Sequence, residues 1–85
     1  MNRYSVEVKG IVQGVGFRPF TFRTAKEFNL CGFVRNTSEG VLIEIQGEKI
    51  NCDAFVSALK HNPPPLAYIE SVKLTEIPLE DDDDF

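Results

Sequence analysis

The sequence predicts an α+β domain of the ferredoxin-like type, β-α-β-β-α-β, with an antiparallel sheet that carries both helices on one face. Two observations lead to this prediction. Strand-like and helix-like segments follow one another in that order, and turn residues separate them. In addition, 85 residues suffice for one small domain, which we take to cover residues 1–85.

The first half of the chain supplies a strand, a loop and a helix. Tyr4, Val6 and Val8 alternate with polar residues, which predicts a half-buried strand ending at Gly10. After a glycine-rich loop, Pro19 stands where the first turn of a helix tolerates proline. The apolar face of this helix comprises Phe17, Phe20, Thr24, Ala25 and Phe28. We expect the helix to end near residues 29–30, before Gly32.

The second half supplies a hairpin, a helix and a last strand. Residues 32–36 form a short second strand, residues 37–40 have the composition of a turn, and residues 41–47 alternate as the third strand. Residues 50–61 form the second helix, which the prolines that follow terminate. Its apolar face comprises Cys52, Phe55, Val56 and Leu59. Residues 66–77 form a fourth strand, whose imperfect alternation predicts a bulge.

Composition narrows the possible partners. The net charge of −4 disfavours a general nucleic-acid binder, which would carry a basic patch. The N-terminus lacks the apolar core of a signal peptide, and no apolar run approaches the roughly 18 residues that span a bilayer. We therefore expect a cytoplasmic protein without nucleic-acid or membrane partners.

The sequence does not predict a metal or other cofactor. Cys31 and Cys52 form no C-x-x-C pair and are expected to be small buried or half-buried residues. The single histidine, His61, is expected at the surface near the end of the second helix. Residues 80–85, "EDDDDF", resemble an acidic solvated loop with Phe85 stranded at its end. We interpret this ending as a cut inside a longer polypeptide.

The stretch "QGVGFR", residues 13–18, has the composition of an anion-binding loop. Gly14 and Gly16 let the backbone turn its N–H groups inward, and the helix that follows adds its positive end. Arg18 can offer a two-pronged bond to phosphate oxygens. The stretch fits neither a P-loop nor a dinucleotide-binding fingerprint. From these residues alone, an ordinary strand-to-helix turn with a surface arginine explains the pattern equally well.

Asn36, at the end of the second strand, is the second candidate. Parallel pairing of the first strand with the strand after the first helix would bring Asn36 beside the glycine loop. An asparagine that merely initiates the hairpin turn is the alternative.

Taken together, "GIVQGVGFR" and the later "VRNTSEG" resemble the signature of the acylphosphatase family. The resemblance implies a phosphate-binding loop formed by Gln13, Gly14, Val15, Gly16, Phe17 and Arg18. It implies that Arg18 binds the phosphate, that Asn36 orients the attacking water, and that Thr37 supports Asn36. Apart from Glu39 in the turn of the second motif, no His, Cys or carboxylate stands in either motif, which agrees with a mechanism in which the substrate's own phosphate can take the proton.

Within this family, "GFRPF" and "NPPPLAYIESV" are similar to the N-terminal domain of the HypF hydrogenase-maturation carbamoyltransferases. That resemblance implies carbamoyl phosphate as the substrate and the other domains of a longer enzyme as partners. It leaves three alternatives open: a stand-alone acylphosphatase, an RNA-binding module of the same strand order, and a non-catalytic docking module.

Overall fold

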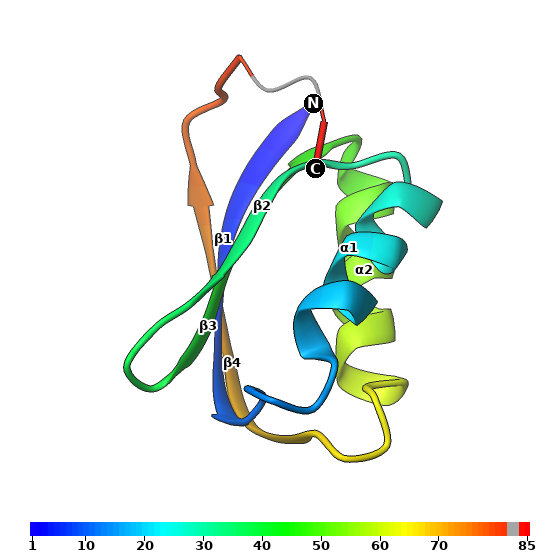
Figure 1. Ribbon diagram of the computed structural model, residues 1–85. Helices are drawn as coiled ribbons and strands as arrows, with labels where there is room; N and C mark the ends of the chain where they lie inside the picture. Colours follow the sequence, from blue (N-terminus) through cyan, green and yellow to red (C-terminus); the bar gives the residue numbers. More distant parts are fainter. Residues whose placement is uncertain (82–83) are drawn as a thin grey trace.

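The computed structural model describes residues 1–81 and 84–85, and its elements follow the predicted order. They are β1 (Asn2–Ile11), α1 (Phe17–Glu27), β2 (Cys31–Asn36), β3 (Gly40–Gly47), α2 (Lys49–His61) and β4 (Tyr68–Ile77). The strands form one antiparallel sheet in the order β2-β3-β1-β4. Figure 1 shows both helices on the same face of this sheet, as predicted.

The expected parallel pairing of the first two strands is wrong. β1 pairs with β3 and β4, while β2 pairs with β3. The tight hairpin makes β3 the neighbour of β2, and β1 then takes the other edge of β3. Because β3 runs antiparallel to both neighbours, β1 and β2 still run in the same direction and end at the same end of the sheet.

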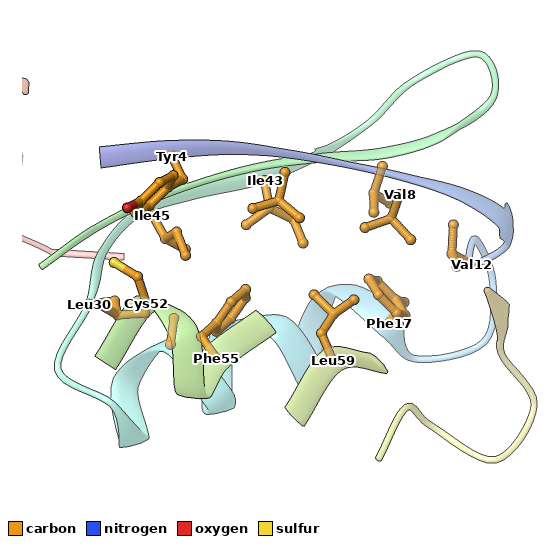
Figure 2. Close-up of a cluster of buried hydrophobic side chains, with 13 residues drawn as sticks. Tyr4, Val8, Val12, Phe17, Leu30, Ile43, Ile45, Cys52, Phe55 and Leu59 are labelled. Carbon is orange, nitrogen blue, oxygen red and sulfur yellow. The ribbon is translucent and has the colours of Figure 1, made fainter. Parts of the chain in front are cut away.

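The core lies between the sheet and the helices (Figure 2). Alternate residues of β1 and β3 point towards the fully buried Phe55 and Leu59 of α2 and Phe17 of α1. Thr21 of α1 is also fully buried, although its polar character left it out of the predicted face. Its hydroxyl donates to the Phe17 carbonyl oxygen at 2.9 Å, so its burial leaves no unpaired donor.

The predicted bulge in the fourth strand is confirmed. Lys9 pairs with Ser71, but Gly10 pairs with Ile69, so Glu70 is the additional residue. Gly10 adopts a φ of 136°, and a Cβ there would lie 2.1 Å from the Tyr68 carbonyl oxygen. This close approach of two backbones requires glycine.

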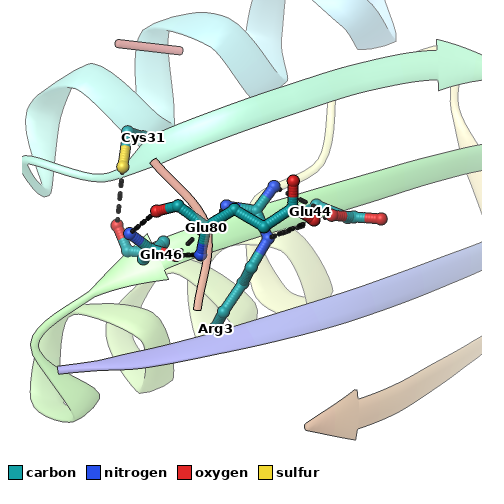
Figure 3. Close-up of polar contacts among 5 residues, drawn as sticks. All are labelled: Arg3, Cys31, Glu44, Gln46 and Glu80. Atoms are coloured by element: carbon teal, nitrogen blue, oxygen red, sulfur yellow. Dashed lines mark hydrogen bonds and ion pairs between the residues drawn. The ribbon is translucent and has the colours of Figure 1, made fainter. Parts of the chain in front are cut away.

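The face of the sheet away from the helices carries a polar cluster that the sequence did not predict (Figure 3). The alternation of β1 places Arg3 on this face, yet only 1% of its surface is exposed. Its Nη2 lies 2.8 Å from Glu44 Oε1, and its Nη1 donates to Gln46 Oε1. The Gln46 amide also exchanges two 2.8 Å hydrogen bonds with the backbone of Glu80. The chain after β4 thus returns to the sheet and covers Arg3.

The expectation of a stranded Phe85 is wrong. The Phe85 ring packs beside Phe22 of α1, with 6.3 Å between ring centroids, and the Asp84 carbonyl oxygen accepts from Gly32 N on β2 at 3.1 Å. The ring is apolar and a free surface of α1 lies within reach, so it packs there instead of remaining in water. Residues 82 and 83 of the expected acidic loop lie outside the described residues.

The predictions for the cysteines and the histidine are confirmed. Cys52 is buried and Cys31 is half-buried, and neither forms a disulfide. His61 is exposed, and its Nδ1 lies 2.9 Å from the Ser57 carbonyl oxygen. Among the described helices, none has the length and apolar character needed to cross a membrane.

Candidate active site

The loop between β1 and α1 is held in place at both ends. Val12 precedes the glycines and Phe17 follows them, and each is only 1% exposed (Figure 2). Gly14 and Gly16 between them have φ values of 73° and 78°. A Cβ at either glycine would meet no atom within 4 Å, so the left-handed backbone, and not lack of space, favours glycine there.

This loop presents a run of free backbone donors. Within the described part of the chain, no N–H from Gly14 to Arg18 donates to a protein acceptor. Gly16 is the N-cap of α1 and supplies no capping side chain, and the first turn contains no acidic residue. Pro19 has no N–H to contribute. The start of α1 therefore offers backbone donors and the positive end of a helix dipole to an anion.

Arg18 adds a full positive charge beside these donors. Its side chain is exposed, and no carboxylate of residues 1–81 or 84–85 forms an ion pair with it. A guanidinium without a protein partner can bind two oxygens of a phosphate group in one plane.

Asn36 shares a hollow with this loop. The hollow has a volume of about 240 Å³ and is lined by residues 12–14, residues 16–19 and Asn36. Asn36 ends β2, whose last residues lie at the same end of the sheet as the end of β1. Its side-chain amide has no hydrogen-bond partner among the described residues, and neither His, Cys nor a carboxylate lines the hollow. The structure thus brings together Gly14, Gly16, Phe17, Arg18 and Asn36.

Val15 and Thr37 lie outside the lining of this hollow. Val15 is half-buried and packs against the core, so only its backbone can contribute to an anion site. Thr37 closes the hairpin turn: its Oγ1 accepts from Gly40 N at 3.1 Å, and its own N donates to the Gly40 carbonyl oxygen at 2.9 Å. This turn directly follows Asn36.

The side chain of Gln13 contacts the hairpin turn, which its sequence motif did not indicate. Its Nε2 lies 2.7 Å from the carbonyl oxygens of both Thr37 and Gly40. It therefore joins the glycine loop to the hairpin. Sequence reasoning missed this contact because the two partners are backbone atoms more than twenty residues away.

The chain can be compared with models of known protein families. A family model described as acylphosphatase matches residues 4–85. The chain belongs to the acylphosphatase family. The structure places the family's glycine loop before a helix and not on a strand, so it does not match the arrangement expected of the RNA-binding alternative.

Similar curated proteins in this family are of two kinds. The chain is 48% identical over 81 residues to a probable carbamoyltransferase HypF of Methanocaldococcus jannaschii, an alignment that covers 94% of this chain and 11% of the relative. It is 45% identical over 78 residues to an acylphosphatase of Oceanobacillus iheyensis, which covers 91% of this chain and 86% of the relative.

Solved structures divide in the same way. A crystal structure of full-length HypF in a phosphate- and nucleotide-bound form superposes with a TM-score of 0.97 and 42% identity, covering 99% of this chain and 11% of that one. The acylphosphatase of Bacillus subtilis superposes with a TM-score of 0.94 and 37% identity, covering all of this chain and 96% of that one. The chain thus spans about a tenth of the HypF proteins it matches and nearly the whole of the stand-alone acylphosphatases.

Proposed function

We propose that this chain hydrolyses acyl phosphates by transfer of the phosphoryl group to water. The observation that carries the proposal is the shared hollow, which Gly14, Gly16, Phe17 and Arg18 line together with Asn36, beside N–H groups that have no acceptor in the described part of the chain. An acyl phosphate is a mixed anhydride, so the site needs to position charge and water more than it needs a nucleophile.

Arg18 and the loop N–H groups bind the phosphoryl group. Donors that are already oriented can stabilise the charge on the equatorial oxygens in the transition state without further rearrangement. The amide of Asn36 holds a water molecule in line with the bond that breaks, with Thr37 supporting the turn behind it. Water forms a new P–O bond as the bond from phosphorus to the acyl oxygen breaks, giving a carboxylate and phosphate.

The proton of the attacking water goes to the substrate. Neither His, Cys nor a carboxylate is among the residues that line the hollow. A phosphate oxygen of the substrate accepts the proton, and the chain needs no general base of its own. The proposal requires no cofactor in this domain.

The substrate that we propose is carbamoyl phosphate, within a longer carbamoyltransferase of hydrogenase maturation. The likeness to HypF proteins supports this choice, as does Pro19 in the motif "GFRPF". In that setting, the domain releases phosphate and passes carbamate to other domains of the same cytoplasmic enzyme. A stand-alone acylphosphatase is the alternative that the relative from Oceanobacillus iheyensis supports.

The test is phosphate release from carbamoyl phosphate and acetyl phosphate by the wild type, Arg18→Ala and Asn36→Ala. Removal of one charge-stabilising donor in comparable sites lowers kcat about 10²–10³-fold, and we expect each variant to lose at least that much. Arg23→Ala is a matched control, because Arg23 is an exposed arginine of the same helix that does not line the hollow. Asn62→Ala, at the end of α2, is the control for Asn36.

The outcomes separate the proposals. Full activity in folded Arg18→Ala or Asn36→Ala would contradict the assigned roles. A folded wild type that releases no phosphate from either substrate would contradict the proposed activity and leave a docking module. The ratio of kcat/KM for the two substrates distinguishes a carbamoyl phosphate enzyme from a general acylphosphatase.

A further inference from the structure

Gln13 connects the two halves of the proposed site through a single side chain. It lies two residues after the end of β1 and directly before Gly14, and its Nε2 lies 2.7 Å from the carbonyl oxygens of Thr37 and Gly40. These acceptors stand at the two ends of the hairpin turn that begins directly after Asn36. The bonds thus run from the phosphate-binding loop to the segment that carries the proposed water-orienting residue.

These contacts use the donor capacity of the Gln13 amide. A side-chain amide nitrogen has two hydrogens, and each is taken by one carbonyl. The nitrogen therefore has no hydrogen left for a phosphate oxygen. This differs from the neighbouring backbone N–H groups from Gly14 to Arg18, which have no acceptor in the described part of the chain.

Among the described residues, two side-chain contacts link the hairpin turn to β1 and the loop after it: the Gln13 amide, and an ion pair of 3.3 Å between Lys9 and Glu39. The internal bonds of the turn, from Thr37 N and Gly40 N, determine its shape but do not connect it to the loop. Thr37, Ser38 and Glu39 are all exposed, so little packing holds the turn in place. A side chain that binds both ends of the turn is well placed to set the separation between Asn36 and Arg18.

We propose that Gln13 is a positioning residue of the hydrolytic site, which acts through Asn36 and makes no contact with the phosphate through its amide nitrogen. The proposal rests on the proposed function. It predicts that loss of the Gln13 donors affects the chemical step, in which the water must be in line, more than it affects phosphate binding.

The test is a double-mutant cycle on kcat with Gln13→Met and Asn36→Ala. Methionine keeps the length of the side chain and removes both donors, and because Gln13 is exposed the substitution leaves the packing of the core unchanged. Misplacement of a catalytic group by about 1 Å can cost about a hundredfold, so we expect Gln13→Met to lower kcat about tenfold to a hundredfold. In the Asn36→Ala background the same change should lower kcat by less than about twofold.

Two further measurements separate positioning from stability and from direct binding. Gln46→Met is the matched control, because Gln46 also bridges backbone groups through its amide, but together with Glu80 and away from the hollow. We expect it to lower the free energy of unfolding and leave kcat unchanged. The Kd of inorganic phosphate should change by less than about threefold in Gln13→Met, since the loop donors remain.

Additive losses of kcat in the cycle would overturn the inference while leaving the proposed function intact. A loss of phosphate affinity as large as the loss of kcat would also overturn it, because Gln13 would then act on the phosphate. A wild type without acylphosphatase activity would overturn the proposed function and this inference together.

Discussion

Substitution of Gly16 by alanine tests the link between backbone conformation and anion binding. Gly16 has φ 78° and ψ 18° and is the N-cap of α1. A methyl group there would meet no atom within 4 Å, so the cost arises from the left-handed backbone alone. That conformation costs a non-glycine residue about 1–2 kcal/mol. In a domain of this size the melting temperature should fall by about 4–16 °C.

The effect on phosphate should exceed what the loss of stability explains. An alanine that relaxes from the left-handed region turns its neighbouring N–H groups away from the hollow. Loss of one hydrogen bond to a charged group costs about 1.5–3 kcal/mol. The affinity for inorganic phosphate, measured by calorimetry on the folded protein, should therefore fall about tenfold or more.

Asn29→Ala is the control for this substitution. Asn29 also has a positive φ, 56°, but it lies beyond the other end of α1 and away from the hollow. It should lower stability without changing the affinity for phosphate. Unchanged phosphate affinity in Gly16→Ala would refute the reasoning, because the glycine conformation would then be unnecessary for the anion site.

Two further predictions concern the core. Phe55 is fully buried, so Phe55→Ala should lower the free energy of unfolding in urea by about 3–5 kcal/mol, and a loss below about 1 kcal/mol would show that the described packing is wrong. Burial raises the pKa of the Cys52 thiol above its ordinary value of 9.0, so the folded protein keeps a proton that the unfolded chain releases. The contribution of the protonated Cys52 thiol to the stability of the fold is fully present below pH 9.0 and is lost as the pH rises towards the folded pKa. Between about pH 8 and pH 10, the free energy of unfolding should therefore fall more steeply in the wild type than in Cys52→Ala. Equal slopes would contradict the prediction.

The element order and the helix-facing side of the strands could be predicted because they depend on local periodicity. Alternation along β1 correctly predicted Tyr4, Val6 and Val8 as core residues. Arg3 lies on the other face of the same strand, and it is buried because the chain near Glu80 returns over it. Nothing within a few residues of Arg3 indicates that return.

The candidate site was predictable where its chemistry depends on residue type. Gly14 and Gly16 do adopt positive φ, and Arg18 does lie beside them without an ion-pair partner among residues 1–81 and 84–85. Asn36 does share their hollow, but the reason given for it, direct pairing of β1 with β2, is wrong. The contacts of Gln13 could not be predicted, because their acceptors are carbonyl groups that only the folded hairpin brings near.

The most direct test of the anion site is an NMR titration of the ¹⁵N-labelled chain with inorganic phosphate. The account predicts that the backbone amide signals from Gly14 to Arg18 all shift on addition of phosphate and give the same Kd. In Arg18→Ala that Kd should be higher. The amides near Gln46, at a distance from the hollow, should remain unchanged. Loop amide signals that do not move at saturating phosphate, or shifts confined to the surface lysines, would contradict the central claim.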